Sequence, residues 1–420
     1  MKYFKTLLLS LALILSGCSN NQEAKPEENT VTEETTVKEE GKETENKNET
    51  DKEEDTEKEG AEKVESTSQK DGYPKTVTDL AGNEITLEKP LDKVIIQGSS
   101  SGGPFMPMMY IDKDNFLSKI AAMDDSVKID RNDFYTRLEK EMPEIEDVPR
   151  IANFMDNDFS YESILNTDAD GIIAPIGFKT QIEAIQEKID IPVFYVDYHS
   201  QEFDKHIAST KLIADITGLD KNLDELIDFY TSKVSPIIEK KFEESEKPKV
   251  YVEHGYEGEK EYGNSYGSNK MWGKIVEDVG GHNIGSDALG ADEAIPLSSE
   301  FVLAENPEKI ILTGSQWVEK PHSMKMGYDT TADWVQEKVD QYKTRPGWSD
   351  LDAMKNHEVY VISQQLVRDM SDFYAYEYLA KTFHPDVYGD LDPDKDLKEF
   401  YEKFMPIDLE GTWSYKYEEK

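Results

Sequence analysis

Short apolar segments that alternate with helical segments constrain the fold of this chain more than any other feature. Most of these segments are apolar throughout, which is typical of strands in a parallel sheet covered by helices on both faces. The predicted strands are residues 94–96, 120–123, 171–174 and 192–196, followed much later by 249–253, 310–312 and 359–362. The pattern therefore predicts an α/β protein with two Rossmann-like lobes, each built on a mostly parallel sheet.

Residues 222–242 separate the two groups of strands. Seven apolar side chains recur there at helical spacing, namely Leu223, Leu226, Ile227, Tyr230, Val234, Ile237 and Phe242. The segment predicts one long α-helix of about 30 Å that joins the lobes. Pro236 lies inside it, lacks an amide hydrogen and is expected to kink it. The predicted boundaries are 72–218 for the first lobe, 219–247 for the connection and 248–420 for the second lobe.

The first 17 residues have the pattern of an export signal. Lys2 and Lys5 precede an apolar run at 7–15, which is too short for a transmembrane helix. The run ends in Leu-Ser-Gly before Cys18, which resembles the lipobox of bacterial lipoproteins. That resemblance implies a lipid on Cys18; the alternative is a plain secretory signal with an incidental cysteine. Because Cys18 is the only cysteine, the sequence excludes a disulfide framework, an iron–sulfur cluster and a cysteine-based zinc site.

Residues 18–71 are rich in Glu, Lys, Thr and Asn and contain almost no aliphatic side chain before position 64. Such a composition cannot bury enough apolar surface to fold, so we expect a disordered acidic tether. The formal net charge of the whole chain is −41. A surface this acidic repels nucleic acid and anionic lipid head groups, which we therefore exclude as partners.

Three stretches together resemble the substrate-binding proteins that serve iron-siderophore and cobalamin ABC importers. T-V-T-D-L-A-G-N-E-I-T-L at 76–87 is similar to the opening of that family, and S-E-F-V-L-A-E-N-P-E-K-I-I at 299–311 to a helix–strand element of its second lobe. R-P-G-W at 345–348 is similar to its closing segment. The resemblance covers the chain from about Tyr73 onwards. It implies two α/β lobes bridged by one long helix, little closure on the ligand, and no enzymatic activity.

The resemblance also implies a role for Glu162 and Glu300, which match the glutamates with which that family docks on arginine pockets of the permease. Each glutamate precedes a pair of isoleucines by the same interval in its own lobe. Two fixed carboxylates can meet two guanidinium groups in bidentate geometry and set the orientation of the complex. The alternative is that both merely stabilise the first turn of a helix.

Ligands of open α/β lobes bind beyond the carboxyl ends of the strands, so the loops there are the candidate site. One of them, Gly-Ser-Ser-Ser-Gly-Gly at 98–103, matches neither the dinucleotide fingerprint nor the phosphate loop. The candidate ligand-binding residues in these loops are Ser99, Ser100, Ser101, Phe105, Phe178, Lys179, Tyr198, His199, His254, Tyr262, Asn264, Tyr266, Lys270, Trp272, Trp317 and Arg368. Aromatic faces with a few polar tips suit a flat organic chelate or a macrocycle.

Positive charge in this acidic chain would come from Lys179, Lys270, Lys325 and Arg368. A ferric catecholate would need several of these charges, while a neutral hydroxamate chelate would need fewer. His199 and His254 follow strands of different lobes and could ligate a metal, although a hydrogen-bonded histidine is the simpler interpretation. No serine-hydrolase elbow, H-E-x-x-H pair or complete calcium loop is present, and we predict neither a resident metal nor a covalent cofactor.

The sequence thus predicts a monomeric solute-binding lipoprotein at the extracytoplasmic face of a bacterial cell membrane. It would capture a ferric siderophore and deliver it to an ABC permease and its ATPase. Haem, cobalamin, molybdate and tungstate remain open as ligands; Ser99, Ser100 and Ser101 offer hydroxyl and amide groups that an oxyanion would need. A lipid-anchored metallohydrolase and a surface adhesin are the alternatives from other classes.

Overall fold

The computed structural model describes residues 72–156 and 159–418. The expected signal peptide, Cys18 and the tether at 18–71 lie outside these residues. Within them, no helix combines the length and the apolar character that a membrane span requires.

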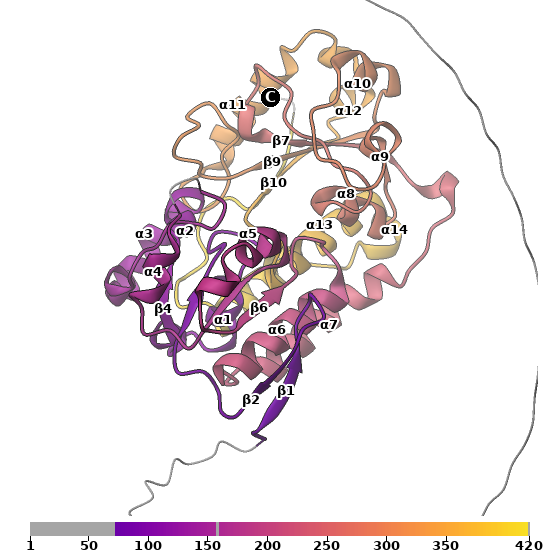
Figure 1. The fold of residues 1–420 in the computed structure, drawn as a ribbon. Coiled ribbons are helices and arrows are strands. Elements are labelled where there is room, and N and C mark those ends of the chain that lie inside the picture. Colours follow the sequence, from indigo (N-terminus) through magenta and orange to yellow (C-terminus); the bar gives the residue numbers. More distant parts are fainter. Residues whose placement is uncertain (1–71, 157–158, 419–420) are drawn as a thin grey trace, which may run out of the picture. The chain divides into compact units, whose positions relative to one another are not determined.

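The first lobe is built on a four-stranded parallel sheet in the order β4-β3-β5-β6 (Figure 1). The strands are β3 Val94–Ile96, β4 Ile120–Met123, β5 Gly171–Pro175 and β6 Val193–Val196. Every residue of the four strands is buried, as their continuous apolar sequences predict. The expected hairpin at 76–87 is also present, as antiparallel strands β1 Lys75–Thr78 and β2 Glu84–Leu87.

The second lobe contains a five-stranded sheet in the order β11-β10-β9-β7-β8. Four strands are parallel, namely β7 Lys249–His254, β8 His282–Asn283, β9 Lys309–Gly314 and β10 Val359–Ser363. The fifth, β11 Ser414–Lys416, is antiparallel to β10 at the edge of the sheet. Two lobes with mostly parallel sheets confirm the predicted fold class.

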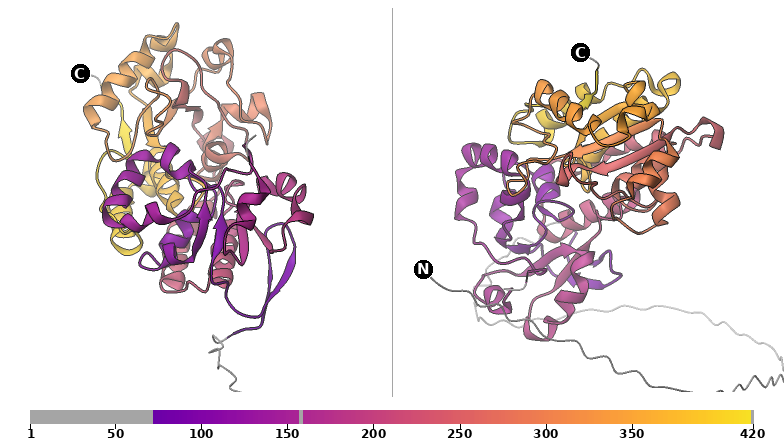
Figure 2. Two further views of the ribbon diagram at one scale, coloured as in Figure 1. Left: turned by 60° about the vertical axis from the view of Figure 1, so that its left-hand side comes forward. Right: turned by 90° about the horizontal axis from the view of Figure 1, so that it is seen from above.

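Helices surround both sheets (Figures 1 and 2). In the first lobe they are α1 Phe105–Ile111, α2 Ser126–Asp130, α3 Asn132–Glu141, α4 Tyr161–Leu165, α5 Lys179–Glu183 and α6 Phe203–Thr217. After α7 Leu223–Ile238 come α8 Met271–Asp278, α9 Ile284–Leu289, α10 Ser299–Glu305, α11 Ala332–Lys343 and α12 Asp352–Lys355. The chain continues with α13 Phe373–Phe383, α14 Pro385–Tyr388 and α15 Pro393–Phe404.

The connection between the lobes centres on α7, which is shorter than the sequence predicts. It ends at Ile238, shortly after Pro236, so its 16 residues span about 24 Å rather than 30 Å. Phe242 lies beyond the helix and stacks on His384 with ring centroids 3.6 Å apart. Helix α6, which the sequence analysis left out, precedes α7 and turns into it through Gly218 at a left-handed φ of 70°. Helix α6 packs beside α7, and the chain passes into the second lobe from the end of α7 (Figure 1).

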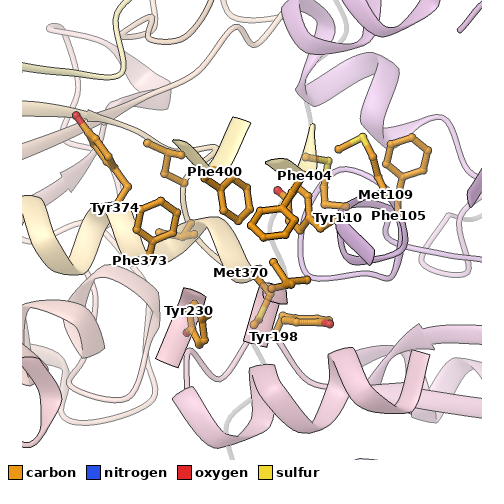
Figure 3. Close-up of a cluster of buried hydrophobic side chains, with 14 of the residues drawn as sticks. Phe105, Met109, Tyr110, Tyr198, Tyr230, Met370, Phe373, Tyr374, Phe400 and Phe404 are labelled. Carbon is orange, nitrogen blue, oxygen red and sulfur yellow. The ribbon is translucent and has the colours of Figure 1, made fainter. Parts of the chain in front are cut away.

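The two lobes share one hydrophobic cluster at this junction (Figure 3). Tyr110 of α1 meets Phe400 of α15 edge to face at 4.9 Å, and Phe229 of α7 meets Phe373 of α13 at 5.1 Å. Separate lobes move freely only when the surface between them is small or polar. A common aromatic core therefore favours small relative movements, as the family resemblance implies.

The same junction holds a buried carboxyl group, Glu377 of α13. The Nζ of Lys233 lies 3.8 Å from its Oε1 and 2.5 Å from Oδ2 of Asp396. Burial, reinforced by the negative charge of Asp396, raises the pKa of Glu377 to about 8 despite the opposing effect of Lys233. Glu377 is therefore neutral at pH 7.

Candidate ligand-binding site

Two adjoining cavities open between the lobes at the carboxyl ends of the strands. One has a volume of about 310 Å³ and the other of about 820 Å³. Ser100, Ser101, Asp130 and Arg368 line both cavities, so the two form one cleft. Its walls follow the ends of β3, β6, β7, β9 and β10, which is where the α/β architecture predicts a ligand.

The loop at 98–103 forms one wall, and its polar groups are largely occupied by the protein itself. The amides of Gly98 and Ser99 donate to Oδ2 of Asp124 at 2.6 and 3.3 Å, and the Ser99 hydroxyl donates to Oδ1 at 2.9 Å. The amide of Ser100 donates to the Ser126 hydroxyl at 2.9 Å. The carboxylate of Asp124 therefore fills the position that an oxyanion would take on this loop.

Gly102 in the same loop makes room for His199. Its φ of 73° is left-handed, and a Cβ atom there would lie 2.1 Å from the imidazole ring. Glycine at this position lets the His199 ring pack against the backbone and line the larger cavity.

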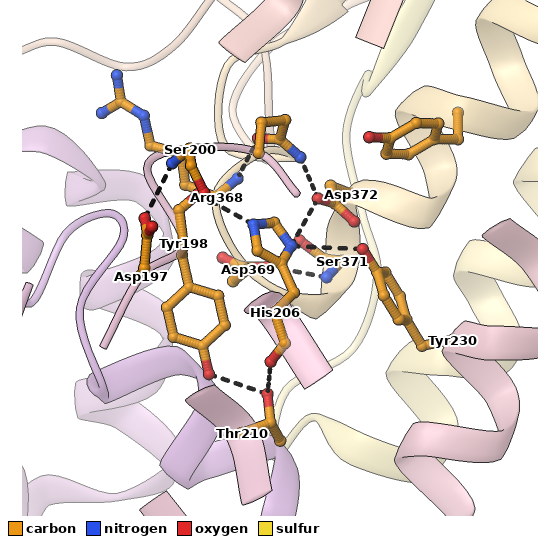
Figure 4. Close-up of polar contacts among 12 residues, drawn as sticks. Asp197, Tyr198, Ser200, His206, Thr210, Tyr230, Arg368, Asp369, Ser371 and Asp372 are labelled. Atoms are coloured by element: carbon orange, nitrogen blue, oxygen red, sulfur yellow. Dashed lines mark hydrogen bonds and ion pairs between the residues drawn. The ribbon is translucent and has the colours of Figure 1, made fainter. Parts of the chain in front are cut away.

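Arg368 is the central cation of the cleft. Its backbone has a left-handed φ of 63°, and its amide donates to the Gln201 side chain at 3.2 Å. Its guanidinium forms no ion pair with any described residue, and its buried Nε has no hydrogen-bond partner. Figure 4 shows this side chain pointing away from the neighbouring polar network. Burial, together with the charge of Arg131, lowers the pKa of Arg368, but the group stays positive in the physiological range.

The turn that carries Arg368 is held by buried polar contacts to the first lobe (Figure 4). Asp369 accepts from Tyr110 at 3.2 Å and lies 3.4 Å from the guanidinium of Arg131. Asp372 lies 3.1 Å from Nδ1 of His206. Burial would lower the pKa of His206, but the Asp372 carboxylate outweighs this effect and raises it. These contacts fix the backbone at Arg368 relative to both lobes.

Two imidazoles line the cleft, one on each lobe. Burial, with a further contribution from Arg368, lowers the pKa of His199 to about 3 and that of His254 to about 4. Both rings are therefore neutral at pH 7. His254 also packs against the aromatic wall of the second lobe, with its ring 4.9 Å from Trp317 and 5.8 Å from Tyr256. In residues 72–156 and 159–418, no three metal-ligating side chains are grouped to hold an ion.

The structure brings nine of the predicted ligand-binding residues to the cleft. They are Ser100, Ser101, Phe178, His199, His254, Asn264, Tyr266, Trp317 and Arg368. Phe178 comes from the segment before α5, and Asn264 and Tyr266 come from the glycine-containing loop before α8. Loops that follow strand ends therefore supply most of the walls, as predicted.

The other predicted residues lie elsewhere. Phe105 and Tyr198 are fully buried in the core, where Phe105 packs against Phe116 and the Tyr198 hydroxyl meets Thr210. Ser99 is bonded to Asp124, as described above. Trp272 is buried and donates from Nε1 to the cleft residue Gln364 at 2.7 Å, so it supports the wall from behind.

Tyr262 and the predicted lysines also lie outside the two cavities. Tyr262 accepts a hydrogen bond from Nε1 of Trp348 at 2.7 Å and packs within the second lobe. Lys179 lies 3.7 Å from Glu183 on its own helix, and Lys270 precedes α8, from where its charge helps to lower the pKa of His199. Lys325 does not line the cleft either.

Sequence reasoning missed several residues of the cleft. Asp130 is the last residue of α2 and Arg131 lies between α2 and α3, so neither directly follows a strand and the strand-end rule did not select them. Arg150 lines the larger cavity and pairs with Asp125 at 3.1 Å. Gln364 and Gln365 belong to the loop after β10, which the strand-end rule does select, although only Arg368 was singled out in it.

Glu162 and Glu300 occupy equivalent positions on the two lobes. Each is the second residue of a short helix, α4 or α10, and each helix is capped by the hydroxyl of the preceding serine. Both side chains are exposed, and neither forms an ion pair with a residue that the structure describes. The structure shows that the two glutamates are equivalently placed. Their role in docking on the permease stays a prediction.

Comparison with known proteins places the chain in a family. Residues 115–366 match the family model described as periplasmic binding protein. The Bacillus subtilis ABC transporter substrate-binding lipoprotein YvrC is 20% identical over 334 residues, which cover 78% of this chain and 91% of YvrC.

Solved structures share the fold. The TroA-like periplasmic binding protein FepB from Veillonella parvula is 35% identical with a TM-score of 0.76, over 82% of this chain and 99% of that one. The molybdate-bound MolA protein from Haemophilus influenzae is 17% identical with a TM-score of 0.56, over 80% and 99%. The chain therefore belongs to the periplasmic binding proteins, the solute-binding components of ABC transporters.

Proposed function

We propose that this protein captures a ferric siderophore in the cleft around Arg368 and delivers it to an ABC permease. The observation that carries the proposal is the guanidinium of Arg368, which lines both cavities and has no carboxylate partner among the described residues. A guanidinium in a partly buried site donates charge-assisted hydrogen bonds to chelate or carboxylate oxygens. The neutral imidazoles of His199 and His254 add polar contacts from either lobe.

The charge of the cleft favours a hydroxamate chelate over a catecholate. Arg131 and Arg150 are already paired with Asp369 and Asp125. Lys179, Lys270 and Lys325 lie outside the cavities, so within the described residues no other cation that lines the cleft is free to share a highly charged ligand with Arg368. A ferric tris-catecholate carries several negative charges, while a ferric hydroxamate has little or none.

The geometry gives an oxyanion less support. The amides of Gly98, Ser99 and Ser100 are taken by Asp124 and Ser126, so the loop offers no ready anion site. A cleft of this volume also exceeds what molybdate or tungstate would fill, and is in the range of pockets for organic ligands. Haem and cobalamin fit the volume better, and remain the alternatives within the family.

We further propose that a lipid on Cys18 holds the protein at the extracytoplasmic face of the cell membrane, and that it acts as a monomer without catalysing a reaction. Its partners would be the permease and the associated ATPase. The exposed carboxylates of Glu162 and Glu300 would dock on basic pockets of the permease. The similarity to YvrC, itself named a lipoprotein, supports this location.

The proposal is tested by titrating the purified protein with ferric hydroxamate, ferric catecholate, haem, cobalamin and molybdate. Tryptophan fluorescence reports binding, because Trp317 lines the cleft. We expect saturable quenching by the ferric hydroxamate below 1 μM, a typical order for tight small-ligand binding. Silence across the panel would contradict the proposal; turnover of a substrate would point to the hydrolase, and binding of only a macromolecule to the adhesin.

Arg368→Ala provides the matched test of the site. Loss of one charge-assisted hydrogen bond, roughly 1.5–3 kcal/mol, should weaken binding about ten- to hundredfold. Lys211→Ala removes an exposed cation from α6, away from the cleft, and should leave the affinity unchanged. Equal affinities for wild type and Arg368→Ala would place the ligand elsewhere.

A further inference from the structure

Exposed apolar side chains gather at the cleft. In the part of the chain that the structure describes, six large apolar side chains are strongly exposed. Two of them, Ile129 and Met155, line the larger cavity, and two more, Ile295 and Val318, each follow a lining residue in the sequence. Single exposed apolar residues scattered over a surface are ordinary, whereas a group of them at one cavity marks an interaction site.

The first lobe supplies two of these side chains directly to the larger cavity. Ile129 of α2 is 47% exposed and Met155, in the segment between α3 and α4, is 54% exposed. Ile151 and Phe178 line the same cavity. Apolar side chains therefore form one part of the lining of this cavity, beside carboxylates such as Asp124 and Asp130.

The second lobe supplies the other two. Val318 is 61% exposed and lies between Trp317 and Glu319, which line the smaller and the larger cavity respectively. Ile295 is 50% exposed and follows Ala294, which lines the smaller cavity. These two side chains are neighbours of cleft residues in the sequence but do not line the cavities, so the apolar side chains that line the cleft directly are those of the first lobe.

We infer that the cleft takes a chelate with an apolar periphery, whose metal-binding oxygens face Arg368 while aliphatic groups contact Ile129 and Met155. This inference rests on the proposed function and specifies its ligand class. A small hydrophilic chelate would leave these two side chains in water. Covering them adds the favourable free energy of apolar burial.

Two iron complexes test this inference. Ferric tris-acetohydroxamate and ferric tris-hexanohydroxamate present the same metal centre and the same charge, and differ only in the length of their alkyl chains. Both are titrated into the purified wild-type protein, the double variant Ile129→Ser with Met155→Ser, and Val387→Ser. Val387 is the matched control, because it is 51% exposed on α14 and does not line the cleft.

We expect the hexanohydroxamate complex to bind wild type at least about tenfold more tightly than the acetohydroxamate complex, since each buried methylene contributes roughly 0.8 kcal/mol. The double variant should lose most of this preference, and Val387→Ser should keep it. Equal affinities of the two complexes for wild type would overturn the inference while leaving the proposed function intact. Absence of binding by both complexes would instead contradict the proposed function.

A third outcome separates the ligand from the permease. If the double variant keeps the tenfold preference but supports slower iron uptake in cells, the apolar side chains contact the permease and the inference is wrong. Exposed apolar side chains contribute little to folding, so the serine variants should unfold at the wild-type urea concentration. That measurement shows whether a lost preference reflects the cleft or a damaged fold.

Discussion

Removal of the Arg345 guanidinium should destabilise the second lobe strongly. Arg345 is buried and forms two parallel hydrogen bonds to Glu253, at 2.7 Å to Oε2 and 2.8 Å to Oε1. It also donates to the carbonyls of Gly258, Glu259 and Glu261 at 2.6–2.8 Å. Three aromatic rings surround its guanidinium at 4.4–4.5 Å.

The magnitude follows from what Arg345→Ala leaves behind. Glu253 would remain as a buried carboxylate without its charge partner, which costs about 3–5 kcal/mol. That is a large part of the 5–15 kcal/mol typical of a folded domain. The effect should reach the cleft as well, because the clamped segment lies between His254 and Asn264, which both line it.

Urea unfolding followed by circular dichroism measures the effect, with the slope checked for a change in cooperativity. Lys89→Ala, which breaks an ion pair whose side chains are 65% and 71% exposed, should not move the midpoint. Arg345→Met combined with Glu253→Leu should recover part of the loss, since no buried charge remains. A loss below about 1 kcal/mol for Arg345→Ala would refute the reasoning.

Three further predictions concern the junction, the cleft and the permease. The pKa of Glu377 is higher in the folded state, so this carboxyl group stabilises the fold fully below its unfolded pKa of about 4.5. The stabilisation is lost as the pH rises through the folded pKa of about 8. The wild-type free energy of unfolding should thus fall relative to Glu377→Gln between pH 5 and 8, by up to about 4 kcal/mol; parallel pH profiles would contradict this. Trp317→Phe should strongly reduce the fluorescence response to ligand, whereas Trp334→Phe, on α11 and outside the cleft, should retain it; a response lost only in the second variant would exclude the cleft as the binding site. Glu162→Ala with Glu300→Ala should slow uptake in cells without changing ligand affinity, and uptake at the normal rate would exclude their docking role.

The central strands could be predicted from sequence because their apolar residues are continuous and all are buried. Helix α6 could not, because its buried face includes His206, Ser209, Thr210 and Thr217, which read as polar. Thr210 and Thr217 satisfy their hydroxyls with carbonyls one turn back in the same helix, whereas His206 meets Asp372, which is distant in the sequence. Hydrophobic periodicity does not contain that information.

The candidate site was predictable to the extent that it follows strand ends. His199, His254 and Arg368 were found in this way, whereas Phe105 and Tyr198 follow strands yet point into the core. Which face a side chain takes depends on the packing of the next helix. The hydrogen bonds from the loop at 98–103 to Asp124 could not be predicted either, because they depend on the pairing of β3 with β4.

The most direct test of the central claim is the position of the iron in a crystal of the protein grown with a ferric hydroxamate. Anomalous scattering recorded at the iron absorption edge locates the metal independently of the fitted chelate. We predict one strong peak inside the cleft, between the guanidinium of Arg368 and the imidazole of His254. A strong peak at any other place, or none in a crystal whose protein binds the complex in solution, would contradict the account.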